Sequence, residues 1–334
     1  MVAVLNGRRA ANQDLTPYSV VVSPASPPRS AYLAWATICV VWGTTYLAIK
    51  LALDTIPPFL MGGLRYTIAG GVLAAYLAAR GQRLPPRAEW RAFALIGLLM
   101  LGFGNGGVVL AEQWVPSGLA AVVIATSPFW MVGLDALLSG GERLRARQLS
   151  GLAIGFVGIV ILVGPDLVLD TGSRRATAAG IVALQLACAG WALGTAYSRR
   201  KAPHVEPMPA AALQMLFGGA FMLLAGTAFG EWAHLRITPS GSLLLLYLAL
   251  FGAVAGFVAY LHALRHLPVA FVSLYAYVNP VIAVALGTWL LAEPFNRRMA
   301  IAIAAVLLGM TVVSMRPRAQ TIEREAGAGA AADR

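Results

Sequence analysis

The sequence predicts an all-α integral membrane protein with ten transmembrane helices arranged as two inverted five-helix repeats. Composition, the lengths of the apolar runs and internal similarity support this fold class. The chain of 334 residues is 59% hydrophobic and only 12% charged, whereas soluble proteins carry about 25% charged residues. Most of its net charge of +11 lies in strips between apolar runs, as is usual at membrane faces. We therefore expect a lipid bilayer as partner and no nucleic acid.

Ten apolar runs approach the length of a membrane-spanning helix, which needs about 20 residues. The runs are continuous, while the strands of a transmembrane barrel alternate between apolar and polar residues. Short polar linkers between the runs predict one compact bundle. Residues 1–30 and 317–334 are rich in small and polar residues and are expected to be disordered cytoplasmic tails. The ten runs are 32–53, 59–79, 92–114, 117–139, 149–165, 177–199, 209–230, 242–263, 269–291 and 299–315.

The distribution of lysine and arginine predicts the orientation, because basic residues concentrate in cytoplasmic loops. With the N-terminus inside, the inner segments hold 18 basic residues and the outer segments hold six, while Arg65 lies within a helix. Both termini are therefore expected to be cytoplasmic.

The second half of the chain resembles the first. At a shift of 149 residues Trp42 falls on Trp191, and at a shift of 152 Pro128 falls on Pro280. Because five helices is an odd number, the second copy must cross the membrane in the opposite sense. Inverted repeats of this kind are typical of secondary transporters, which open alternately to either side of a central site. The two repeats are expected at residues 31–166 and 177–316.

Pro128 and Pro280 lie near the middle of the fourth and ninth predicted helices, close to the membrane centre. A proline inside a helix removes the partner of the carbonyl four residues earlier, here Ile124 or Ala276. Such backbone is tolerated at this depth only inside protein or beside a water-filled cavity. A structural kink, with the carbonyl bonded by a neighbouring hydroxyl group, is the alternative for a single proline. A symmetric pair at the midplane favours a substrate site.

Three stretches resemble motifs of one known family. They are WGTTYLAIK (42–50), ATSPFWMVGLDALLSGGERLRARQLSGLAIGFVGIVI (125–161) and YVNPVIAVALGTWLLAEPFNRRMAIAIAAVLLGM (277–310), the last with Ala292-Glu293 in place of Gly-Glu. Over about residues 32–316 the chain resembles the EamA family of the drug/metabolite transporter superfamily. The resemblance implies ten helices, a central cavity and export of small metabolites across a bacterial inner membrane, without a cofactor. Within the family, the chain is most similar to the bacterial aromatic amino-acid exporters (YddG-like).

Aromatic and neutral polar residues converge near the predicted midplane. Trp42 and Trp191 are repeat equivalents, and Trp130 follows Pro128 by half a turn, although tryptophan normally gathers at membrane interfaces. Buried tryptophans are also ordinary core residues, so the prediction rests on their convergence. An aromatic cavity with a few neutral polar groups suits a zwitterion with an apolar side chain, such as a neutral or aromatic amino acid. The predicted cavity residues are Trp42, Tyr46, Asn105, Thr126, Ser127, Pro128, Trp130, Trp191, Tyr275, Asn279 and Pro280.

Few charged groups lie within the predicted helices. Arg65 lies about two turns below the outer surface, where a charge is costly, and Glu112 is its expected partner. This pair is predicted to hold two helices together, to gate the outer side, or to contact a substrate carboxylate. Asp135 is expected to be paired near the inner surface, so facilitated export is preferred to proton antiport. Glu142 and Glu293 are expected to stabilise the N-terminus of the next helix.

Other motifs and functions are less well supported. The run GFGNGG (102–107) satisfies a dinucleotide fingerprint but lacks the preceding strand. Its Gly102 and Gly106, like Gly252 and Gly256, are expected to allow close helix packing. His262 and His266 lack further metal ligands nearby, so no metal is expected. Proton-coupled efflux of drugs or other metabolites by the same fold is the alternative function. An intramembrane enzyme is disfavoured because no catalytic motif is present, and a monomer is favoured while the oligomeric state stays open.

Overall fold

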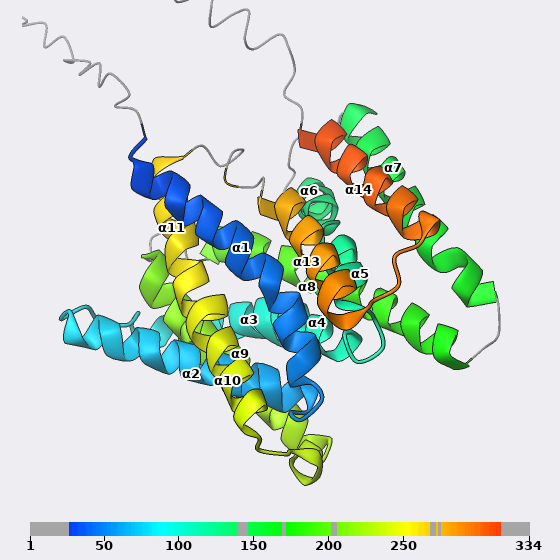
Figure 1. The fold of residues 1–334 in the computed structure, drawn as a ribbon. Coiled ribbons are helices and arrows are strands. Elements are labelled where there is room, and N and C mark those ends of the chain that lie inside the picture. Colours follow the sequence, from blue (N-terminus) through cyan, green and yellow to red (C-terminus); the bar gives the residue numbers. More distant parts are fainter. Residues whose placement is uncertain are drawn as a thin grey trace, which may run out of the picture.

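The computed structural model describes residues 27–138, 146–168, 172–201, 206–267, 272 and 275–314. All regular elements in these ranges are helical, and they pack into a bundle (Figure 1). The elements are α1 (Arg29–Ala52), α2 (Pro58–Ala79), η1 (Arg87–Glu89), α3 (Trp90–Gly97), η2 (Leu98–Asn105), α4 (Gly106–Ala111), α5 (Ser117–Ile124), α6 (Ser127–Leu138), α7 (Ala146–Val168), α8 (Gly172–Lys201), α9 (Pro207–Ala228), η3 (Glu231–His234), α10 (Pro239–Tyr247), η4 (Leu248–Ala255), α11 (Gly256–His266), α13 (Tyr275–Leu291) and α14 (Arg297–Ser314).

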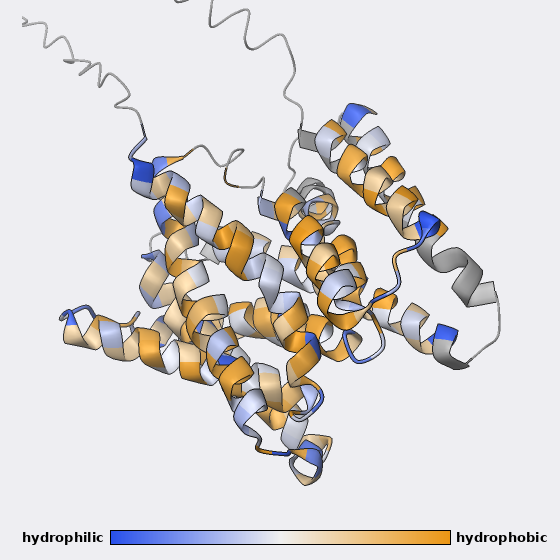
Figure 2. Ribbon diagram, in the orientation of Figure 1, coloured by the Kyte–Doolittle hydropathy of each residue, from blue (hydrophilic) through white to orange (hydrophobic). Residues whose placement is uncertain are grey.

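Six helical stretches in the described residues are long and apolar enough to cross a membrane, and three shorter apolar helices accompany them. Large apolar side chains on the outside of the bundle, such as Leu137, Leu243 and Trp289, are exposed. Hydrophobic residues dominate the helices in Figure 2, while hydrophilic residues gather at helix ends and loops. Such an apolar surface is stable in contact with the hydrocarbon chains of a bilayer and unfavourable in water. The chain is therefore a multi-pass membrane protein. The six stretches are Arg29–Ala52, Pro58–Ala79, Arg87–Ala111, Arg174–Ser198, Pro207–Ala228 and Pro239–Ala263.

The third and eighth predicted helices are continuous but change their winding. In each, a π-helical segment of eight residues, η2 or η4, follows a short α-helix and leads into another that begins at Gly106 or Gly256. π-Helical turns are rare and often lie at functional sites. The two segments occupy equivalent places in the two predicted repeats, and both border the cavity described below.

The prediction of a single helix over 117–139 is wrong. The structure has two helices there, α5 and α6, separated by a turn at Ala125 and Thr126. By contrast, α13 continues through Pro280. The start of the ninth predicted run, Glu142 and almost all of both predicted tails lie outside the described residues.

Close helix pairs hold the bundle together, most extensively α2 with α9 and α7 with α14. At the first crossing, a Cβ added to Gly63 would lie 2.8 Å from the backbone nitrogen of Leu223. A Cβ added to Gly219 would lie 2.7 Å from the backbone nitrogen of Thr67. Glycine therefore lets these two backbones touch, as small residues do at membrane helix crossings.

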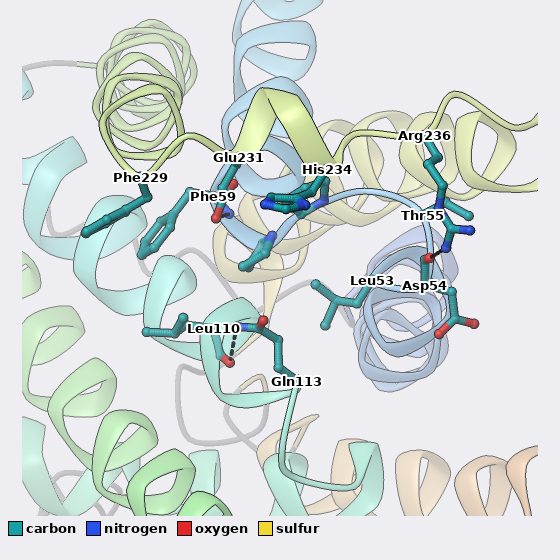
Figure 3. A pocket seen from close by; sticks show the side chains of 12 residues that line it. Leu53, Asp54, Thr55, Phe59, Leu110, Gln113, Phe229, Glu231, His234 and Arg236 are labelled. Carbon is teal, nitrogen blue, oxygen red and sulfur yellow. Dashed lines mark hydrogen bonds between the residues drawn. The ribbon is translucent and has the colours of Figure 1, made fainter.

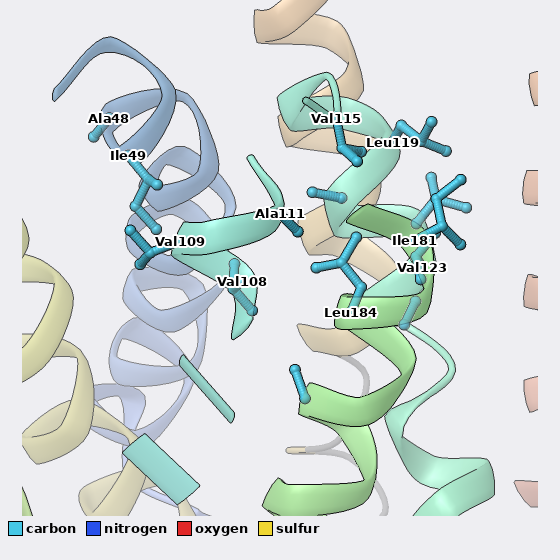
Figure 4. Close-up of a cluster of buried hydrophobic side chains, with 14 of the residues drawn as sticks. Ala48, Ile49, Val108, Val109, Ala111, Val115, Leu119, Val123, Ile181 and Leu184 are labelled. Atoms are coloured by element: carbon cyan, nitrogen blue, oxygen red, sulfur yellow. The ribbon is translucent and has the colours of Figure 1, made fainter. Parts of the chain in front are cut away.

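The largest apolar core joins the two halves of the chain. Figure 4 shows side chains from α1, α4, α5 and α8 meeting in this cluster, among them Ile49, Val109, Val123 and Leu184. Each of these four side chains is at most 3% exposed. This packing fixes one end of the bundle and positions α1, α5 and α8 around the central cavity.

Candidate functional site

A central cavity of about 250 Å³ lies where α1, α2, α5, α6, α8, α9, α13 and the two π-helical segments converge. The structure brings together most of the side chains predicted from sequence, including Arg65. Two predicted cavity residues, Thr126 and Trp130, do not line it, and neither does Glu112. The predicted residues that line the cavity are Trp42, Tyr46, Arg65, Asn105, Ser127, Pro128, Trp191, Tyr275, Asn279 and Pro280.

Thr126 and Trp130 support the cavity wall from behind. Thr126 is fully buried. The indole nitrogen of Trp130 donates to Gln185 Oε1 at 2.8 Å, and Gln185 Nε2 donates to Thr126 Oγ1 at 3.0 Å. This chain of hydrogen bonds ties the α5–α6 break to α8. The role of these two residues is therefore to position the wall, and contact with a substrate is not expected.

The carbonyl that Pro128 leaves without a helical partner is already bonded. Ser127 Oγ donates to Ile124 O at 2.6 Å, and Thr126 Oγ1 donates to Val123 O at 2.7 Å. Serine and threonine hydroxyl groups can replace helical hydrogen bonds in this way. At Pro128 the structure therefore has the alternative arrangement, in which a neighbouring hydroxyl group bonds the carbonyl.

Asn279 has a different role beside Pro280. When its amide is oriented so that the nitrogen faces the acceptors, that nitrogen donates to the carbonyl oxygens of Cys39 and Tyr275, each at 3.1 Å. The first of these bonds joins α13 to α1, and the second spans one turn of α13. Asn279 is therefore held in place at the cavity wall, with its amide hydrogens already engaged.

Aromatic rings form one side of the cavity. Trp42 Nε1 donates to Gly252 O at 3.1 Å, and its ring meets that of Tyr275 edge-on at 5.0 Å. Gly256 makes room for this indole, since a Cβ there would lie 2.3 Å from Trp42 Nε1. The repeat-equivalent pair is Gly104 with Trp191, where the corresponding distance is 3.3 Å to Cε3.

This glycine geometry corrects a prediction. Gly252 and Gly256 were expected to bring helices together, but they accommodate side chains instead: a Cβ at Gly252 would press against Thr45 and the Arg65 guanidinium. Of the glycines at 102–107, Gly107 makes a tight contact with α8, whereas Gly102 and Gly106 do not. Their neighbours in other helices are 3.4 Å or more away.

Arg65 is enclosed beside the cavity and is only partly engaged. It is 5% exposed, its guanidinium lies 4.9 Å from the centre of the Tyr66 ring, and its Nε has no hydrogen-bond partner. The predicted pairing with Glu112 is not formed as a hydrogen bond, because both carboxylate oxygens of Glu112 also lack a partner. A buried cation with an unused donor is a suitable contact for an anionic group.

Several cavity residues were not predicted from the sequence. The internal repeat could have indicated Gln214, because the shift that aligns the tryptophans places it on Arg65. The others are apolar or aromatic and are indistinguishable by type from core residues. The main unpredicted residues are Tyr66, Met100, Met131, Cys188, Gln214, Met215 and Phe257.

Two carboxylates of the second half cap helices of the first half. Glu293 accepts from Ser117 N at 2.7 Å, Ser117 Oγ at 2.8 Å and Gly118 N at 3.0 Å, at the start of α5. Glu231 accepts from Leu60 N at 2.8 Å and Phe59 N at 3.3 Å, at the start of α2. Glu293 is thus structural, as expected, but it caps α5 and not the next helix, α14.

A wider cavity of about 560 Å³ opens at the surface beside the Glu231 cap (Figure 3). Phe59 and Phe229 stack at one side of it, with ring centres 5.4 Å apart. Arg236 donates to the Asp54 carbonyl at the other side. None of the described residues lining this cavity has a buried polar side-chain atom without a partner. The central cavity is therefore the stronger candidate site.

Known proteins share this architecture. The model of the EamA-like transporter family matches residues 29–164 and again 178–315. An uncharacterized inner membrane transporter, YedA of Escherichia coli strain K12, is 36% identical over 277 residues, covering 83% of this chain and 88% of that protein. A probable amino-acid metabolite efflux pump of Salmonella typhimurium is 24% identical over 295 residues, covering 85% and 94%. A crystal structure of a protein matches with a TM-score of 0.60 at 26% identity, covering 85% and 97%.

The family match and the relatives confirm the resemblance at the family level. The narrower placement among aromatic amino-acid exporters stays a proposal. The chain belongs to the EamA-like transporter family.

Proposed function

We propose that the protein exports neutral amino acids, aromatic ones included, across a bacterial inner membrane. The observation that carries this proposal is the central cavity, in which one buried cation faces an aromatic and otherwise uncharged lining. One relative is itself described as a probable amino-acid metabolite efflux pump, which supports the same substrate class.

The cavity chemistry matches both ends of a zwitterion. The substrate carboxylate would bind Arg65, whose Nε has no protein partner. The ammonium group would lie against the rings of Trp42, Trp191 or Tyr275, because aromatic faces attract cations. The amide of Asn105 supplies a neutral polar group at the same cavity. An apolar side chain would contact the methionines and rings of the remaining wall.

The size and charge of the cavity argue against other substrates. Its volume of about 250 Å³ is below the roughly 300–1,000 Å³ of typical drug-sized pockets. Arg65 is the single charged side chain among the described residues that line it. A phosphorylated metabolite would need more than one cation, and a dicationic drug would need acidic groups.

Alternating access by two inverted repeats is the proposed mechanism. The family model matches two successive parts of the chain. The π-helical segments η2 and η4 are equivalent in the two parts, as are the Trp42–Gly256 and Trp191–Gly104 contacts. Elements that surround one site in equivalent pairs can exchange conformations and open either side in turn. With both termini inside, the Glu293 and Glu231 caps would lie at the outer face.

The experiment is uptake into proteoliposomes containing the purified full-length protein. We expect uptake of phenylalanine, tryptophan and leucine, and no uptake of a sugar phosphate or a dicationic dye. Running each substrate with and without a pH gradient separates facilitated export from proton coupling. Preference for the phosphorylated or the dicationic compound would reject the proposal.

A further inference from the structure

Glu112 is the most enclosed acidic residue in the described part of the chain. It directly follows α4, it is 0% exposed, and neither carboxylate oxygen has a hydrogen-bond partner. Burial of an ionised carboxylate without partners is strongly unfavourable, and such a group is neutralised instead. The proposed amino-acid site does not use this residue, because it lies outside the cavity lining.

The carboxylate of the neighbouring Glu293, in contrast, is fully hydrogen-bonded. Its oxygens accept three hydrogen bonds from Ser117 and Gly118 at the positive end of α5, while the oxygens of Glu112 accept none. The charges of the two acids act on each other. Glu112 therefore lacks the hydrogen-bond donors that surround the carboxylate of Glu293.

Cations are near Glu112 but do not bond its carboxylate. Lys50 on α1 donates its ammonium hydrogens to the backbone carbonyls of Glu112 and of Val115, the latter at 3.3 Å. Arg65 on α2 also acts electrostatically on Glu112, and Glu112 in turn acts on the phenol of Tyr46 on α1. With Glu293, these are the charged and titratable groups near Glu112 in the part of the chain that the structure describes. Lys50 thus bonds the backbone of Glu112 while the side chain of the same residue has no hydrogen-bond partner.

We propose that Glu112 is a proton-binding site, occupied while this end of the bundle encloses it and emptied when α1, α4 and α5 separate. On opening, the Glu112 carboxylic acid releases one proton to water and becomes a carboxylate. The Lys50 ammonium then leaves the Glu112 and Val115 carbonyls, which water can bond, and pairs with the new charge. Protons on that side of the membrane therefore favour the closed end, which makes opening dependent on pH.

The first test needs no substrate, so it is independent of the amino acid assigned above. Infrared spectra of the purified full-length protein would be recorded while pH is raised. A carbonyl band of a protonated carboxylic acid should disappear with rising pH in the natural protein and should be absent from Glu112→Gln. Asp54→Asn, which alters an exposed carboxylate at the same end of α1, should retain the band. A band that persists in Glu112→Gln would overturn the proposal.

Lys50→Met gives a second variant that leaves Glu112 in place. Without the ammonium that would pair with the carboxylate, the band should persist to higher pH than in the natural protein. An unchanged or lowered titration point would contradict the role given to Lys50.

The second test measures opening. A cysteine at Asn105, in a background without Cys39 and Cys188, would be exposed to an impermeant thiol reagent in intact cells and in everted vesicles. From one side, labelling should accelerate at least about threefold as pH on that side is raised, and Glu112→Gln should label slowly at every pH. This result is expected whether or not amino acids are the substrate. The same pH dependence in Glu112→Gln, or none in the natural protein, would overturn the proposal.

Discussion

Two proline segments with the same spacing, around Pro128 and Pro280, have different structures. The first is broken into α5 and α6, while α13 continues through its proline. The residues before each proline also bond different carbonyls. Thr126 and Ser127 bond the carbonyls of the preceding turn with their own hydroxyl groups, whereas Asn279 bonds Tyr275 O one turn back and Cys39 O in α1.

Equivalent positions of the two predicted repeats therefore differ in local structure. Hydroxyl side chains compete with the helix for its carbonyls and permit a break, while the amide of Asn279 spans a turn and preserves the helix. The cavity thus has one interrupted and one continuous proline-bearing wall. The charge is also asymmetric, because Gln214 occupies the position that the predicted repeat aligns with Arg65.

Replacing each proline with alanine should give the largest difference in transport between the two walls. In Pro128→Ala the new N–H favours a continuous helix over the break, so we expect the cavity wall to move and transport to fall at least about tenfold. In Pro280→Ala the helix is already continuous, and a proline in a helix interior costs about 3 kcal/mol. This variant should therefore gain thermal stability and lose less transport. Equal losses in both variants, at equal expression, would remove the distinction.

The stability of the interrupted wall should also depend on the Glu293 cap at the start of α5. Glu293→Ala removes three hydrogen bonds at the start of α5, and loss of a cap costs about 0.5–2 kcal/mol. Thermal unfolding in detergent should show this loss. Glu206→Ala is the matched control, since Glu206 precedes α9 but its side chain caps nothing. A similar melting temperature for both variants would show that the Glu293 contacts contribute no stability.

The smallest predicted effect is a change in stability at Ala292, the residue that follows α13. Ala292 has a φ of 51°, a conformation that disfavours residues with a Cβ. Ala292→Gly should therefore raise the free energy of unfolding by about 0.5–1 kcal/mol, after allowing for the greater flexibility of glycine in the unfolded chain. Ala300→Gly, in the exposed face of α14, should lower it by about 1 kcal/mol. A loss of stability in both variants would show that Ala292 is not strained.

The sequence predicts the apolar helices well, because a helix that spans a membrane needs a long apolar run. It also predicts which residues converge, because the internal similarity aligns positions in the two halves of the chain. It thereby anticipates the cavity role of Trp42, Trp191 and Asn279. It does not predict the break before Pro128, which depends on which hydroxyl group reaches which carbonyl. Nor does it predict that Glu293 caps α5, a contact across more than 170 residues, or that Trp130 bonds Gln185 behind the wall and does not face the cavity.

The central claim is that the cavity binds an amino acid through Arg65 and its aromatic wall. The most direct test is the initial rate of phenylalanine uptake into proteoliposomes by Arg65→Gln, Asn105→Ala and Trp191→Ala. Trp289→Ala serves as the control, because Trp289 is 79% exposed on the outside of the bundle. We predict a loss of at least about tenfold for Arg65→Gln and Trp191→Ala, a smaller loss for Asn105→Ala and no change for Trp289→Ala. Natural rates in all three cavity variants, with folding intact, would contradict the claim.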